Sequence, residues 1–274
     1  MGFLGPGDGA LDYFPCRYGA SRLTFRGPRR DLTGEYVVMM GGSETYGRFV
    51  TAPFPSLVEE ELGLPVANLG CQNSGPDVYL ADRAVLDVAG GAHVAVVQIT
   101  GAQNLTNRYY TVHPRRNDRF THASPLLRSL YREVDFTGIH FTGHLLMVLA
   151  GKGQERFAPI VAELKALWLQ RMKLLMQQLP ERRVLLWIAD RPPLAAGQGG
   201  PSYAPWLIDR EMLDELKPLV SAQVEVVMSP AARAEGVRAM RFAPVDEAAA
   251  WSLPGAAAHH EVAKALLPVI KGLM

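Results

Sequence analysis

Residues 36–47 read YVVMMGGSETYG, and this stretch decides the fold that we expect. Five apolar or aromatic residues run without a charge into a pair of glycines. That pattern predicts a short buried strand that ends in a tight turn. Ser43 follows the turn directly. Because open α/β sheets carry their binding and catalytic groups just past the carboxyl ends of strands, we expect Ser43 to be a functional side chain.

Four more apolar runs of strand length follow along the chain. They are mostly uncharged in their middle, which is typical of parallel strands covered on both faces. Segments with helical periodicity alternate with them, and this alternation implies right-handed crossovers and an α/β fold with a parallel five-stranded sheet. The further strands are expected at 65–69, 93–99, 183–189 and 223–228, and the helices at 54–62, 78–89, 155–179, 209–220 and 259–273.

Glycine, proline and arginine are frequent in residues 1–35, which we interpret as an irregular N-terminal arm. Residues 36–274 show no composition change that would mark a boundary, and we expect one α/β domain there. Two segments interrupt its rhythm: an insertion with helical pieces at 105–150, after the third strand, and a Pro- and Gly-rich loop at 191–206. Since both follow strand ends, we expect both to lie near the functional site as lid or substrate loops.

Composition excludes several classes of protein. The 274 residues carry a net charge of +1, which gives no sign of a nucleic-acid partner. Two cysteines are too few for a disulfide framework, and no run of eighteen uncharged apolar residues predicts a membrane span. A cytoplasmic protein without a cofactor is the expectation. Nothing decides between a monomer and a homo-oligomer.

A metal site is not expected either. His140 and His144 lie four residues apart on a predicted helix, but no third ligand accompanies them.

Polar residues that could act together follow four of the predicted elements. Ser43 comes after the first strand, Asn73 after the second and Asn104 after the third, and His259 and His260 begin the last helix. Nucleophilic acyl chemistry needs such a set: a hydroxyl that attacks, an imidazole that takes its proton and hydrogen-bond donors that hold the oxyanion.

These blocks resemble those of the SGNH (GDSL-type) hydrolases, in a divergent bacterial subgroup. Gly41-Gly42-Ser43 is similar to the family's Gly-Asp-Ser, and Gly-Ala-Gln-Asn at 101–104 to its Gly-x-Asn-Asp. The resemblance implies a three-layer sandwich with a flavodoxin-like strand order. It further implies a serine esterase or acyltransferase in which Ser43 is the nucleophile and His259 the base. Gly75, with Gly70 as its rival, and Asn104 would supply the oxyanion hole.

Two acidic positions of the family pattern are missing. Gly42 stands in place of the first-block Asp, and the position three residues before the base is Ala256 for His259 or Ala257 for His260. The chain would then use a Ser-His dyad or a carboxylate from elsewhere, since losing the orienting acid of a triad costs several orders of magnitude in rate. The candidates for such a carboxylate are Asp190 first, then Asp246 and Glu247.

The substrate is expected to be a small-molecule or glycan-linked acyl ester, with an acidic group or a sugar. Residues 108–119 carry four arginines, and arginine side chains suit acidic groups. A solvated surface loop explains this basic segment equally well. The expected substrate-binding residues are Gly42, Gly70, Asn73, Arg108, Arg115, Arg116 and His260.

Other functions stay open beside the esterase. Ser43 could cap the following helix, and Asn104 could stabilise its loop with Asn107 as a rival. The same fold could serve as a catalytically decayed binding or assembly protein that recognises a glycan or an anion. A sulfuryl- or phosphoryl-transferase with a nucleotide donor is a third hypothesis, weakened by the absence of a GxxxxGK[ST] run.

Overall fold

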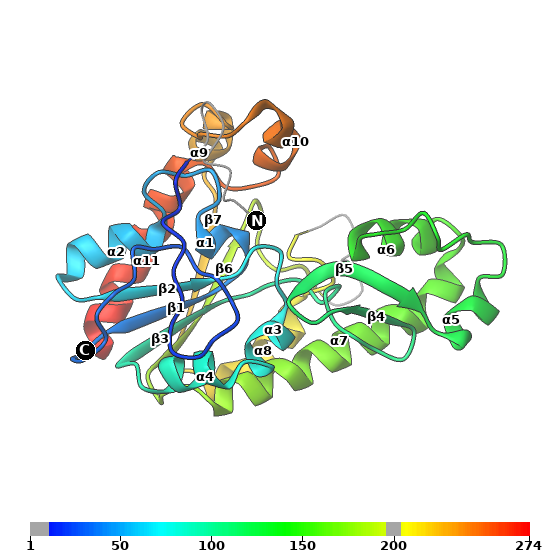
Figure 1. Ribbon diagram of the computed structural model, residues 1–274, viewed down its shortest axis with the longest axis horizontal. Helices are drawn as coiled ribbons and strands as arrows, with labels where there is room; N and C mark the ends of the chain where they lie inside the picture. The colour runs from blue at the N-terminus through cyan, green and yellow to red at the C-terminus, as the bar shows by residue number, and fades with distance from the viewer. Residues whose placement is uncertain (1–10, 196–203) are drawn as a thin grey trace.

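The computed structural model describes residues 11–195 and 204–274. A parallel five-stranded sheet in the order β2-β1-β3-β6-β7 forms its centre (Figure 1). This confirms the predicted α/β fold and the flavodoxin-like strand order. The strands are β1 (Val37–Gly41), β2 (Val66–Gly70), β3 (Val94–Gln98), β6 (Arg183–Ala189) and β7 (Ala222–Val227).

Helices cover both faces of this sheet. Alternate residues of β1 point to opposite faces, so that Val37 and Met39 join one hydrophobic cluster while Val38 and Met40 join the other. The first cluster packs under α2 (Phe54–Leu62) and α11 (Ala256–Leu273). The second packs under α3 (Pro76–Leu80), α4 (Arg83–Gly90), α7 (Gln154–Gln177) and α8 (Arg210–Leu216).

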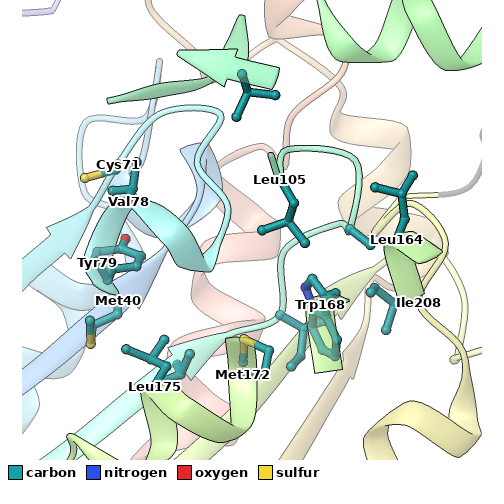
Figure 2. Close-up of a cluster of buried hydrophobic side chains, with 14 of the residues drawn as sticks. Met40, Cys71, Val78, Tyr79, Leu105, Leu164, Trp168, Met172, Leu175 and Ile208 are labelled. Atoms are coloured by element: carbon teal, nitrogen blue, oxygen red, sulfur yellow. The ribbon is translucent and has the colours of Figure 1, made fainter. Parts of the chain in front are cut away.

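The long helix α7 supplies much of the second cluster. Leu164, Trp168, Met172 and Leu175 recur at helical spacing, and each is at most 2% exposed. Figure 2 shows these four side chains of α7 in one buried cluster with Met40 of β1. Trp168 also donates its indole N–H to the carbonyl of Thr100, at 2.9 Å, and so fixes the segment after β3 against the helix.

Three predicted helices have different bounds in the structure. The helix expected at 78–89 is divided into α3 and α4, because the carboxylate of Asp82 accepts the N–H of Val85 and starts a new helix. The helix expected at 209–220 ends at Leu216 and continues as the 3₁₀ turn η1 (Lys217–Leu219). The last helix begins three residues before its predicted start.

The insertion contains an antiparallel hairpin beside its helices, which the sequence reading missed. The hairpin consists of β4 (Tyr110–His113) and β5 (Arg116–Ala123), followed by α5 (Pro125–Leu130) and α6 (Thr142–Ala150). Two register shifts between the strands break the alternation of apolar and polar residues that would have revealed them. The hairpin and both helices extend beyond the edge of the sheet, beside the first half of α7 (Figure 1).

Residues 11–35 form no helix and no strand beyond the isolated bridge between Cys16 and Phe25. They nevertheless belong to the core, since Phe25 is fully buried. Residues 1–10 of the predicted arm, and residues 196–203 of the predicted loop at 191–206, lie outside the described residues.

Short helices that the sequence did not predict lie at two places. α1 (Ser43–Tyr46) follows β1 directly. α9 (Pro230–Glu235), η2 (Pro244–Asp246) and α10 (Glu247–Ala250) connect β7 with α11, above the carboxyl end of the sheet in Figure 1. Within the described part of the chain, no helix is both long and apolar enough to cross a membrane.

Candidate functional site

A pocket of about 400 Å³ lies at the carboxyl ends of β1 and β3. We call it the Ser43 pocket. Segments that are distant in the sequence meet in it, including the insertion and the segment before α11. Its lining includes Gly42, Ser43, Glu44, Asn73, Gln98, Gln103, Asn104, Asp118, Phe141, Thr142, Trp206, Ser252 and Leu253.

Ser43 lies where the sequence predicts it, at the first position of α1. Its side chain is bound by a single neighbour, Asn73. The Ser43 hydroxyl donates to Asn73 Oδ1 at 3.0 Å and accepts the Asn73 backbone N–H at 3.1 Å. Asn73 can reach the hydroxyl with both groups because it adopts a left-handed backbone conformation, with φ 53°.

Asn73 connects Ser43 to a carboxylate of the insertion. Its Nδ2 donates to Asp118 Oδ2 at 3.3 Å. Burial raises the pKa of the Asp118 carboxyl, partly offset by the Asn73 hydrogen bond and by Arg119 and Arg116. The hairpin that the sequence reading missed therefore brings an acidic group to the serine.

The amide of Gln98 organises the opposite side of the pocket. Its Oε1 accepts from the backbone N–H of Gly42, at 2.9 Å, and from the hydroxyl of Thr45, at 2.6 Å. Its Nε2 donates to Glu44 Oε2 at 2.9 Å. One buried side chain at the end of β3 thus positions both the glycine turn before Ser43 and the carboxylate after it.

Two of the predicted oxyanion donors are engaged within the protein. Asn104 lines the pocket, but its Nδ2 donates to the carbonyl of Asn73, at 2.9 Å, and its Oδ1 accepts from Thr142 at 2.6 Å. The N–H of Gly75 donates to Asn117 Oδ1, at 3.3 Å. Both residues thereby hold the loop after β2.

His259 is not brought to Ser43. Its ring is 2% exposed and stacks on Phe54, with ring centres 5.7 Å apart. Nδ1 accepts the backbone N–H of Phe54 at 3.1 Å. Burial, with smaller contributions from Arg26 and His260, lowers the pKa of His259 to about 3. The geometry gives this histidine a place between α2 and α11, where it stays neutral.

The alternative base, His260, and the carboxylates expected to orient the base also lie away from the pocket. His260 is exposed and does not line the pocket. Asp190 is also exposed and pairs with Arg191 at 3.1 Å, and this hydrogen bond is the main cause that lowers the pKa of the Asp190 carboxyl. Asp246 pairs with Arg48 at 2.9 Å.

The arginines expected to bind an acidic substrate are absent from the described lining of the pocket. Arg108 pairs with Glu163 at 3.1 Å and lies over the ring of Tyr109. Arg115 and Arg116 are exposed at the turn of the hairpin.

Gly70 has a packing role next to the site. A Cβ atom there would lie 2.3 Å from the backbone nitrogen of Tyr46, so only glycine lets the end of β2 approach α1.

Several lining residues escaped the sequence reading. Asp118 and Phe141 lie in the insertion, and Trp206 ends the loop at 191–206; both segments are expected near the site, but the sequence predicts neither the hairpin nor these particular side chains. Glu44 and Gln98 had a usable signal, because each adjoins a predicted strand end that carries a polar residue.

The chemical character of the pocket follows from this inventory. It offers several hydroxyls, several amides, two carboxylates and two aromatic rings, and its described lining contains no lysine, arginine or histidine. No cluster of three or more potential metal ligands occurs in residues 11–195 and 204–274. The pocket can therefore bind many hydroxyl groups, but within the described residues it has no imidazole to activate Ser43.

Comparisons with known proteins give a family and a structural likeness. No curated protein matches the chain in sequence. Among solved structures, the chain is similar to a carbohydrate esterase family 2 enzyme with a carbohydrate-binding domain from Corynascus thermopiles (Myceliophthora fergusii). That likeness has 12% identity and a TM-score of 0.40, over 90% of this chain and 68% of the other. A family model described as "Domain of unknown function (DUF6473)" matches residues 1–274, and the chain therefore belongs to the DUF6473 family.

Proposed function

We propose that the protein recognises a sugar-like, hydroxyl-rich ligand in the Ser43 pocket and does not turn it over. In this proposal an SGNH-type framework serves for binding, and Ser43 is a ligand-binding hydroxyl. The observation that carries the proposal is the lining itself, with hydroxyl, amide and carboxylate groups beside two aromatic rings and no imidazole among the described residues.

Hydroxyl groups of a sugar both donate and accept hydrogen bonds, and the lining offers both kinds of partner. Glu44 and Asp118 supply acceptors, while the Ser43 hydroxyl and the Gln103 amide can each both donate and accept. Trp206 and Phe141 offer apolar faces on which a sugar ring can lie. Gly143 keeps the Trp206 ring close to α6, since a Cβ at that glycine would lie 3.3 Å from the indole.

The engaged state of the expected catalytic groups supports binding over hydrolysis. The Asn104 amide and the Gly75 N–H are used by the loop after β2, and His259 is used by α2. A hydroxyl without a base is a weak nucleophile, because its proton has no acceptor during attack. Two carboxylates in the pocket would also repel a sulfate or phosphate group, so we do not favour a nucleotide-dependent transferase.

Titration calorimetry with neutral tetrasaccharides tests the proposal. The panel would contain oligomers of glucose, xylose and N-acetylglucosamine. We expect saturable binding of at least one of them to the wild-type protein. Ser43→Ala and Trp206→Ala should weaken it by roughly tenfold or more, since each removes a direct contact.

Ser56→Ala is the matched control, because Ser56 is exposed on α2, away from the pocket. Its affinity should equal that of the wild type, and thermal unfolding of each variant verifies that it is folded. Absence of binding for the whole panel would refute the proposed function.

A serine esterase is the second candidate, and one observation favours it. The Ser43 hydroxyl is linked through Asn73 to Asp118, a carboxyl whose pKa burial raises. A raised pKa brings a carboxylate closer to the range of a general base. Fluorophosphonate labelling followed by peptide mapping tests this candidate: an adduct on Ser43 that Asp118→Asn prevents would favour it, and an unlabelled folded protein would remove it.

A further inference from the structure

The two carboxylates of the Ser43 pocket form no salt bridge among the described residues. Glu44 Oε2 accepts from Gln98 at 2.9 Å, and Asp118 Oδ2 accepts from Asn73 at 3.3 Å. Both donors are neutral amides, and neither carboxylate takes part in a salt bridge within residues 11–195 and 204–274. Desolvation disfavours an isolated charge, so a ligand that brings a cation to these partly buried carboxylates would be favoured.

The lining of the cavity does not compensate this charge either. Its described residues include no lysine, arginine or histidine. Arg119 lies over the ring of Phe141, with 4.5 Å between its guanidinium carbon and the ring centre. Arg119 and Arg116 lower the pKa of Asp118 through space, but less than burial raises it. A ligand in the pocket would therefore meet two acidic groups from two different elements, one from α1 and one from β5.

We propose that the ligand carries a protonated amine, and that the site selects an amino sugar with a free amino group over its neutral and acidic counterparts. This inference rests on the proposed function and names the substrate class of the same pocket. The ammonium would donate to Glu44 or Asp118, forming the charge-assisted hydrogen bond that both carboxylates lack. The rings of Trp206 and Phe141 would contribute a face to the cationic sugar. A uronic acid or a sulfated sugar would be repelled.

Three tetrasaccharides that differ in one substituent test the inference. They are oligomers of glucosamine, of N-acetylglucosamine and of glucose, titrated into the full chain with EDTA present, so that a bridging metal ion cannot contribute. We expect the glucosamine oligomer to bind roughly tenfold or more tightly than the two neutral ones, the gain of one charge-assisted hydrogen bond. Added salt should reduce this preference.

Variants identify the carboxylates. Glu44→Gln and Asp118→Asn should each reduce the preference for the amine, and the double variant should abolish it, so that the double variant binds the glucosamine oligomer no more tightly than the two neutral ones. Glu60→Gln is the control, because Glu60 is exposed on α2 and does not line the pocket. The preference should be unchanged in that variant.

Each remaining outcome decides one of the two proposals. Equal affinity for all three oligomers would overturn the charge selection and leave the proposed function intact. A preference for the amine that survives in the double variant would place the amine elsewhere, and would equally overturn the inference. Failure of all three oligomers to bind would overturn the proposed function and this inference with it.

Discussion

At the scale of single residues, two titratable groups have opposite relations to water. Asp118 lines an open pocket and is half-buried, whereas His259 is enclosed between two helices. Burial opposes the charged form of each, so it raises the pKa of the acid and lowers the pKa of the base. Asp118 therefore reduces stability above pH 3.8, where it would be ionised in the unfolded chain, and His259 reduces stability below pH 6.5, where it would be protonated there.

Asp118→Asn is expected to raise the melting temperature at pH 7. The folded-state pKa of Asp118 lies above the unfolded value of 3.8. The protein therefore loses stability as the pH rises from 3.8 to the folded-state pKa, because the unfolded chain ionises this carboxyl first. Asparagine keeps an acceptor for Asn73 and removes the charge. Thermal unfolding between pH 3 and pH 7 checks this: the gain should shrink towards zero below pH 3.8. A lower melting temperature at pH 7 would show that the carboxylate stabilises the fold.

His259 should make the protein sensitive to acid. Its folded-state pKa of about 3 lies below the unfolded value of 6.5, so the stability that the neutral ring provides is complete above pH 6.5 and is lost as the pH falls towards 3. Between pH 6 and pH 4 the wild type should lose roughly 2–3 kcal/mol through this group.

His259→Gln tests that expectation, because glutamine can accept the Phe54 N–H and does not titrate. Urea unfolding at several pH values should give a flatter pH dependence for this variant. His260→Gln is the control, since His260 is exposed, and its pH dependence should match that of the wild type. Equal slopes for all three proteins would contradict the buried, neutral state of His259.

At the scale of elements, the sequence predicts regular segments well and the segments that shape the site poorly. The apolar run at 36–40 predicts β1 because a strand covered on both faces is a nearly continuous run of apolar residues. The hairpin β4-β5 has no such pattern, since its register shifts and its exposed arginines interrupt the alternation. Asp118 was missed for that reason. His259 was chosen for its place at the start of α11, and sequence position cannot tell whether a ring points into a pocket or into the core.

The N-terminal arm acts on the site through Arg26. Its guanidinium donates to the carbonyls of Gly47, Val50 and Thr51, which form the loop after α1. It also lies 5.3 Å from the centre of the Tyr13 ring. An irregular segment thereby holds the loop that follows Ser43.

Arg26→Ala should destabilise the protein by about 2–4 kcal/mol, because three carbonyls lose a charged donor at once. Chemical denaturation measures this loss. Arg17→Ala serves as the control, since Arg17 is an exposed residue of the same arm, and its effect should be within about 0.5 kcal/mol of zero. A similarly small effect for Arg26→Ala would show that the arm does not support the loop.

At the scale of the whole molecule, the fold followed from the order of strands and helices, while the pocket depended on long-range assembly. The sequence predicts Ser43, Asn73 and Asn104 together because each follows a strand of one parallel sheet. In the structure the Ser43 hydroxyl bonds the Asn73 side chain, and the Asn104 side chain bonds the Asn73 backbone carbonyl. Asp118 and Trp206 reach the same pocket from the insertion and from the loop at 191–206, and Ser252 and Leu253 from the segment before α11, but the sequence does not predict which side chains of these segments line it. They add one of the two carboxylates and an aromatic ring to the site.

The central claim is that this pocket binds its ligand without hydrolysing it. The most direct measurement follows binding and acetate release in one sample, using an acetylated sugar oligomer with the wild-type protein and with Ser43→Ala. We expect saturable binding that Ser43→Ala weakens, and acetate release no faster than in the variant. Acetate release by the wild type that Ser43→Ala abolishes would contradict the claim and identify Ser43 as a catalytic nucleophile.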